Sequence, residues 1–199
     1  MYDGFAALIF DMDGTLVDSG QLHEMAWIET LNHYSIPIDR ALMRSLAGVP
    51  TLGTVELLLD KFQIRSTSSA MEIHQFKERF VRENLQNMIK PTALLDIVQR
   101  YHGVKPMAVG TGAQTEEALH ILEICGLDKY LNVVVGADQV SNPKPAPDTF
   151  LRCAELLGVP PQHCVVFEDS KLGMEAATRA GMTVVDVLAE LQIHNDYFL

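Results

Sequence analysis

The chain has 199 residues, of which 48% are hydrophobic and 21% are charged, as in ordinary globular proteins. Its net charge of −11 argues against binding to nucleic acid or to an anionic membrane surface, because both attract basic patches. No apolar run is long enough to span a membrane, and the N-terminus has no leader pattern. The three cysteines lie in apolar settings, so we expect reduced thiols and a cytoplasmic protein.

One short strand and then several helices are expected in the N-terminal part of the chain. Residues 6–10 form a short apolar run that is typical of a buried parallel strand. A helical stripe follows, made by Leu22, Met25, Ala26, Trp27 and Leu31. Further helices are expected over residues 40–46, 54–62 and 70–87. Thr51 or Thr54 could cap the middle one, and no strand is expected between residues 18 and 88.

Strands and helices alternate from residue 92 onward. Strands are expected over residues 106–110, 133–137, 164–167 and 183–187. Helices are expected over residues 93–101, 115–125, 148–157 and 172–180. This alternation predicts an α/β fold with a Rossmann-like parallel sheet between two helical layers, a three-layer α/β/α core. The core would comprise residues 1–16 and 89–199, and residues 17–88 would form an inserted helical cap domain.

Two carboxylates follow the first strand directly, in the segment Asp11-Met12-Asp13-Gly14-Thr15. Side chains two residues apart in an extended chain point the same way, so Asp11 and Asp13 would share one face. Such a pair repels itself unless a cation binds or one carboxylate takes a proton. An Asp-x-Asp turn is the simpler reading. A calcium loop is excluded, because its sixth and twelfth positions hold Leu16 and Leu22.

Polar groups also follow the other strands of the predicted sheet. Thr111-Gly112-Ala113 offers a hydroxyl and backbone amides where a phosphate could bind, although an ordinary strand-to-helix turn is the favoured interpretation of this segment taken alone. A dinucleotide fingerprint fails, because its third glycine would stand at Thr115. The carboxyl ends of parallel strands meet at one edge of a sheet, so these groups are expected to gather near Asp11.

A lysine and two further acids complete the set. Lys144 lies in a proline-rich loop that would hold its ammonium in place, although a single lysine is by default a surface residue. Glu168 and Asp169 follow an apolar strand, where Asp169 or Ser170 could also simply cap the next helix. Four acids at one sheet edge would be costly without a divalent cation, and Mg²⁺ prefers such oxygen ligands.

The segment from Asp11 to Ser19 resembles the first motif of the haloacid-dehalogenase-like hydrolases, which are mostly magnesium-dependent phosphatases. Thr111-Gly112, Lys144-Pro145 and Glu168-Asp169 resemble the second, third and fourth motifs. The helical insert resembles the first cap type of the family. Motif order and spacing are similar to the β-phosphoglucomutase-like branch, and the core sequence is similar to the bacterial fructose-1-phosphate phosphatases of that branch.

The resemblance implies a phosphatase for small phosphorylated sugars that works through an aspartyl-phosphate. Asp11 would be the nucleophile and Asp13 the general acid and base. Thr111, Gly112, Ala113 and Lys144 would bind the phosphate. The metal shell would comprise Asp11, Asp169, the backbone carbonyl of Asp13 and, through a water molecule, Glu168.

Two alternatives to a phosphatase stay open: a sugar-phosphate mutase and a non-catalytic binding protein. His23, Thr51 and Lys77 are the candidate substrate contacts in the cap, although each could be a surface residue. Mutases of the branch carry an arginine where this chain has Thr51, but they also carry a histidine at the position of His23. The loss of the arginine favours hydrolysis, because a threonine cannot grip a second phosphate in the same way. The expected assembly is a monomer or a small homo-oligomer.

Overall fold

The computed structural model describes residues 1–198, and the chain divides into two compact units. The first unit, here called the core unit, comprises Met1–Asp18 and Lys90–Asn195. The second, the helical unit, comprises Ser19–Ile89 and the C-terminal residues from Asp196 onward. The C-terminal residues from Asp196 therefore group with the helices, whereas the sequence analysis assigns them to the core.

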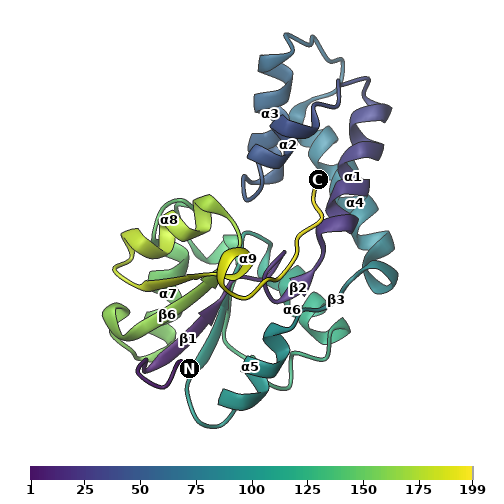
Figure 1. The fold of residues 1–199 in the computed structure, drawn as a ribbon. Coiled ribbons are helices and arrows are strands. Elements are labelled where there is room, and N and C mark those ends of the chain that lie inside the picture. The colour runs from purple at the N-terminus through teal and green to yellow at the C-terminus, as the bar shows by residue number, and fades with distance from the viewer. Residues whose placement is uncertain (199) are drawn as a thin grey trace. The chain divides into compact units, whose positions relative to one another are not determined.

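A five-stranded parallel sheet forms the centre of the core unit, as the alternation of strands and helices predicts (Figure 1). The strand order is β5-β4-β1-β6-β7. The strands are β1 (Ala7–Phe10), β4 (Met107–Gly110), β5 (Val134–Val135), β6 (Cys164–Glu168) and β7 (Thr183–Asp186). The register pairs Phe10 of β1 with Val109 of β4 and Phe167 of β6. The first strand therefore lies in the middle of the sheet, with its C-terminal end beside those of its two neighbours.

Helices cover both faces of this sheet. Residues such as Ala7, Ile9 and Val166 pack in one apolar cluster with residues of α7 (Asp148–Leu157) and α8 (Lys171–Arg179). The alternate residues face the other way, where the rings of Phe10 and Phe167 stack at 4.8 Å. Right-handed crossovers place α5 (Leu94–Tyr101) and α6 (Thr115–Ile124) on that face. The expected three-layer α/β core is confirmed.

The helical unit contains the four helices α1 (Gly20–His33), α2 (Arg40–Ser45), α3 (Thr51–Lys61) and α4 (Ala70–Met88). Its apolar core includes Trp27, Leu31 and Leu58, and α1 packs along α4. A capping box begins α4, because Ser69 and Glu72 each accept a hydrogen bond from the other's backbone N–H.

Two details of the helical unit differ from the sequence expectation. The N-cap residue of α3 is Pro50. Thr51 and Thr54, the two caps expected from the sequence, both lie within the helix. Thr54 instead donates its hydroxyl to the carbonyl of Val49. Met25, expected in the apolar stripe of α1, is 43% exposed. A long thioether at the margin of a stripe can face either way, and sequence spacing alone does not separate the two cases.

Several short elements were not anticipated. The two-residue strands β2 (Val17–Asp18) and β3 (Lys90–Pro91) pair antiparallel at the two places where the chain leaves and re-enters the core unit. Short helical turns also occur: η1 (Ala137–Gln139), η2 (Pro161–His163) and α9 (Val187–Glu190). Among the described residues, no helix has the length and apolar character that a bilayer crossing demands.

Candidate active site

The loop after β1 turns sharply and carries Asp11 to the edge of the sheet. The backbone N–H of Asp11 still donates to the carbonyl of Phe167 at 2.9 Å, so the residue continues the line of the strand. Gly14 then adopts a φ of +81°, a left-handed conformation that strains any other residue. A Cβ at Gly14 would also lie 2.4 Å from Oδ2 of Asp169. Glycine is therefore required here both by the backbone and by the neighbouring acid.

Glu168 and Asp169 come from the end of β6, beside that loop. The Glu168 side chain is 1% exposed, and its Oε2 accepts bonds from the backbone N–H and the hydroxyl of Ser170 at 2.6 and 2.9 Å. Asp169 accepts a bond from the hydroxyl of Thr15 at 3.2 Å. The two acids are thus held by the start of α8 and by the loop after β1.

Lys144 joins the two strand ends. Its Nζ donates to Oδ1 of Asp11 at 2.6 Å, to Oε1 of Glu168 at 2.9 Å and to the carbonyl of Gly110 at 3.1 Å. These three bonds use all three ammonium protons. The ammonium also lies 4.6 Å from the centre of the Phe150 ring. The side chain of Lys144 is only 9% exposed and its ammonium is fully bonded, so Lys144 is not a surface lysine.

Thr111 directly follows β4 at the same sheet edge and is 2% exposed. Its Oγ1 accepts a bond from the backbone N–H of Ala113 at 3.1 Å. That amide, which the sequence suggested as a phosphate donor, is therefore engaged within the turn. Gln114 precedes α6 without a side-chain cap, and the Asp138 carboxylate accepts the backbone N–H of Thr115, the first residue of that helix, at 2.7 Å.

The carboxylates of Asp11, Glu168 and Asp169 form one cluster, in which each offers an oxygen within 4.8 Å of the others. The side chain of Asp13 is not part of this cluster. Three carboxylates and one ammonium leave two negative charges, which a divalent cation would balance. The donors are all oxygen, as Mg²⁺ prefers, so this residue set fits that ion.

Burial controls the protonation of this cluster. Burial raises the pKa of Asp11 well above its usual range, and Glu168 and Asp169 add to the effect while Lys144 opposes it. Burial and the adjacent Glu168 carboxylate likewise raise the pKa of Asp169 to about 7. Although burial works against it, the pairing with Asp11 and Glu168 raises the pKa of Lys144 above its ordinary value. A bound cation would reverse the shifts of the two aspartates.

A model of the haloacid dehalogenase-like hydrolases matches residues 5–181 of this chain. The chain belongs to this hydrolase family. It is 44% identical over 187 residues to the fructose-1-phosphate phosphatase YqaB of Escherichia coli (strain K12), a match covering 94% of this chain and 98% of that protein. It is 36% identical over 178 residues to the phosphorylated carbohydrates phosphatase of Thermotoga maritima, covering 88% of this chain and 82% of that protein.

A solved relative shares the fold of this haloacid dehalogenase-like hydrolase. The crystal structure of β-phosphoglucomutase from Clostridium difficile matches with a TM-score of 0.81 and 24% identity. The match covers 94% of this chain and 87% of that chain. This likeness concerns the fold alone.

The three cap residues named from the sequence lie together in the helical unit of this hydrolase. Lys77, 4% exposed, places its Nζ 3.2 Å from Nδ1 of His23 and donates to Glu78 at 3.2 Å. The hydroxyl of Thr51 donates to the same Glu78 oxygen at 2.8 Å. Burial acts to raise the pKa of Glu78, but the Lys77 ammonium and the hydrogen bond from Thr51 lower that pKa below its usual value. The sequence reasoning missed Glu78, since one more acid on α4 carries no distinguishing pattern.

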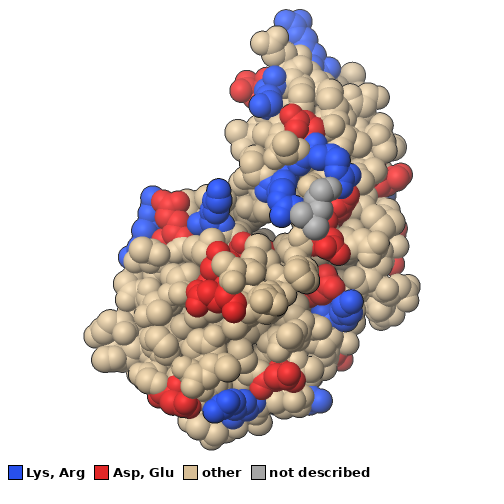
Figure 2. Space-filling model, in the orientation of Figure 1, with Lys and Arg blue, Asp and Glu red and all other residues tan. Residues whose placement is uncertain are grey.

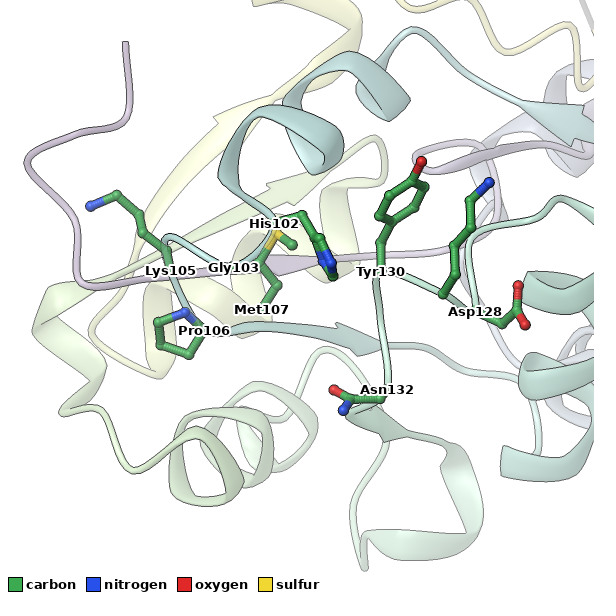
Figure 3. A pocket seen from close by; sticks show the side chains of 9 residues that line it. His102, Gly103, Lys105, Pro106, Met107, Asp128, Tyr130 and Asn132 are labelled. Atoms are coloured by element: carbon green, nitrogen blue, oxygen red, sulfur yellow. The ribbon is translucent and has the colours of Figure 1, made fainter.

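A separate hollow lies elsewhere in the core unit, at the opposite end of β4 (Figure 3). Its lining includes His102, Lys105, Asp128 and Tyr130, and Lys105 points away toward the N-terminal segment. It contains neither the carboxylate cluster nor Lys144. Ligands of parallel α/β sheets bind at the carboxyl ends of the strands, so the hollow is not the candidate active site.

The charged side chains on one face of the core unit form small groups. On the face that Figure 2 shows, acidic and basic side chains lie side by side in places, and uncharged surface separates one group from the next. Long-range attraction of a polyanion needs a continuous basic surface. The candidate site therefore owes its positive charge to particular buried groups such as Lys144 rather than to the surface as a whole.

Proposed function

We propose that the protein is a Mg²⁺-dependent phosphatase that hydrolyses small phosphorylated sugars, fructose-1-phosphate among them. The observation that carries the proposal is the bridge made by Lys144 between Asp11 and Glu168, beside Asp169. It presents a nucleophile, a fixed cation and a set of oxygen ligands at one sheet edge. The names of the Escherichia coli and Thermotoga relatives support the substrate class.

The first half of the reaction would transfer the phosphoryl group to the protein. An oxygen of Asp11 attacks phosphorus, a new O–P bond forms, and the bond from phosphorus to the sugar oxygen breaks. Asp13 gives its proton to the departing alkoxide. Lys144 stays beside Asp11 and offsets the negative charge of the phosphoryl oxygens. The hydroxyl of Thr111 and the backbone of Gly112 and Ala113 lie just after β4, where they would bind the phosphoryl group. The Ala113 N–H would then exchange its bond to Thr111 for one to a phosphoryl oxygen.

The second half would regenerate the carboxylate. Asp13, now ionised, takes a proton from water as the water oxygen attacks phosphorus. The O–P bond to Asp11 breaks, and inorganic phosphate leaves. Asp11, Glu168, Asp169 and the Asp13 carbonyl would hold Mg²⁺, whose charge stabilises the phosphoryl oxygens when it is bound.

A panel of sugar phosphates tests this function directly. Phosphate release is measured with Mg²⁺ for wild type and for Asp11→Asn, which is nearly isosteric. We expect release from fructose-1-phosphate or a related ester by the wild type alone, and only with the metal present. Full activity in excess chelator, or turnover by Asp11→Asn equal to wild type, would contradict the proposal.

A mutase is the second candidate, because His23 and Lys77 contact each other as a polar pair in the helical unit. A mutase must retain a bisphosphate, and the place of the expected arginine is taken by Thr51, whose hydroxyl already bonds Glu78. One neutral hydroxyl binds a phosphate less strongly than a bidentate guanidinium. The bisphosphate would therefore be retained poorly, and water would hydrolyse the phosphorylated protein.

The two activities are separated by their products. β-Glucose-1-phosphate is supplied with catalytic glucose-1,6-bisphosphate, and glucose-6-phosphate is followed against free phosphate. We expect phosphate release to dominate. Glucose-6-phosphate forming many times faster than phosphate would favour the mutase. The cytoplasmic location and the monomeric or small homo-oligomeric state stay predictions.

A further inference from the structure

The segment after α9 reaches the carboxylate cluster of the core unit. Nδ2 of Asn195 donates to Oδ2 of Asp169 at 2.8 Å. A Cβ at Gly14 would fall 2.5 Å from that same nitrogen, so the amide packs directly over the glycine of the loop after β1. Asn195 lies beyond residues 5–181, the span that the family model matches.

Asp169 is consequently held from two sides. Thr15 donates to Oδ1 at 3.2 Å while Asn195 donates to Oδ2. A carboxylate has about four lone-pair positions, so two such bonds fix its plane and still leave room for a cation. Hydrogen-bonded partners behind a metal ligand are the usual means by which proteins aim it.

The chain just before Asn195 is anchored in the core unit. Ile193 is buried there, and its backbone N–H donates to the carbonyl of Val187 at 3.1 Å. An amide on an anchored segment loses little further freedom when it bonds a carboxylate.

We propose that Asn195 is a positioning residue that orients the Asp169 carboxylate toward the divalent cation. The proposal rests on the metal site of the proposed function. It predicts that removing the amide weakens metal binding even when no substrate is present. Partners of this kind contribute about 10- to 100-fold to metal affinity.

Mn²⁺ serves as the probe, because its binding is read by electron paramagnetic resonance without any turnover. Asn195→Ala removes the amide and its volume, whereas Asn195→Leu removes the amide and keeps the volume. Both variants are expected to bind Mn²⁺ about tenfold more weakly than wild type or worse. The half-maximal Mg²⁺ concentration for phosphatase activity should rise in parallel. The control is His194→Ala, which alters an exposed neighbour and should bind Mn²⁺ as the wild type does.

Two results for the Asn195 variants would overturn the proposal. Both variants could bind Mn²⁺ as tightly as wild type does, or Asn195→Leu alone could do so. In either case the hydrogen bond from Asn195 would be irrelevant to metal binding. An equal loss in His194→Ala would overturn the proposal too, by assigning the effect to the segment as a whole. If wild type binds Mn²⁺ but hydrolyses no sugar phosphate, the proposed function fails while this test of Asn195 still stands.

Discussion

Asp11 and Asp13 stand two residues apart but have different surroundings. Asp11 is 7% exposed and bonded to Lys144, whereas Asp13 is half-buried and outside the carboxylate cluster. The Lys144 ammonium opposes the burial that raises the pKa of Asp11, and a carboxylate beside a fixed cation suits nucleophilic attack. The proposed role of Asp13 as general acid and base requires it to give a proton to the leaving group and then to take one from water.

The two roles predict different responses to the leaving group. Asp11→Asn should lose turnover by several powers of ten on every ester, because no acyl phosphate can form. Asp13→Asn should fail severely on fructose-1-phosphate and much less on p-nitrophenyl phosphate, whose phenolate leaves without a proton. Steady-state kcat values for both esters check this. Equal losses on the two esters for Asp13→Asn would count against its role as general acid.

Most residues of the candidate site could be named from the sequence, because each directly follows a predicted strand. Asp11, Thr111 and Glu168 stand at strand ends, and the parallel arrangement then forces them together. Asn195 could not be found in this way. It follows no strand and no motif, and only the path of the C-terminal segment brings it to Asp169.

Helix α8 supports the site through its first turn. The hydroxyl of Ser170 accepts the backbone N–H of Gly173 at 3.0 Å and donates to Glu168 at 2.9 Å. The helix passes so close to this acid that a Cβ at Gly173 would lie 1.6 Å from Oε1 of Glu168. The absence of a side chain at Gly173 therefore allows Glu168 to reach Lys144.

Two glycine substitutions in helices should have opposite effects. Gly173→Ala displaces the Glu168 carboxylate, so we expect a lower Tm and a loss of kcat of about tenfold or more. In Gly53→Ala, in α3, the added Cβ would contact only the Val49 side chain, at an ordinary van der Waals distance of 3.7 Å. It should stabilise the protein by about 0.4–1 kcal/mol and leave kcat unchanged. Thermal melts and phosphatase assays on both variants measure this, and matching behaviour of the pair would refute it.

The longer elements were predicted from the sequence and the shortest were not. Helix α4 has apolar periodicity over 19 residues and a capping box, so its limits follow from local chemistry. The ribbon of β2 and β3 has two residues in each strand, one of them a proline. Only the pairing of segments more than seventy residues apart creates it, and local patterns carry no such information.

The acidic balance of the whole molecule bears on the divalent cation that we propose for the site. A net charge of −11 repels an anionic substrate at long range, so local positive charge must outweigh that repulsion. Within the core unit, Lys144 is already committed to two carboxylates. A divalent cation at Asp11, Glu168 and Asp169 would both relieve their mutual repulsion and attract phosphate.

The same cluster predicts how stability depends on pH without metal. The pKa of Asp169 is raised from 3.8 to about 7 in the folded protein. Between these values the folded state binds more protons than the unfolded state, so stability should fall as pH rises from about 4 to about 7. Asp169→Asn does not titrate and serves as the reference. The urea midpoints of the two metal-free proteins should therefore diverge. As pH rises toward 7, the midpoint of wild type should fall relative to that of Asp169→Asn.

Mg²⁺ should cancel this loss, and its effect on stability should grow with pH. Protons compete with the cation for Asp169 below about pH 7, so binding tightens as the carboxylate ionises. A ligand that binds only the folded protein raises its stability in step with that affinity. We expect millimolar Mg²⁺ to raise the Tm of wild type clearly at pH 8 and little at pH 5.5. Asp169→Asn should show a small rise at both values. A Tm increase for wild type of the same size at pH 5.5 and pH 8 would mean that Asp169 does not bind the cation.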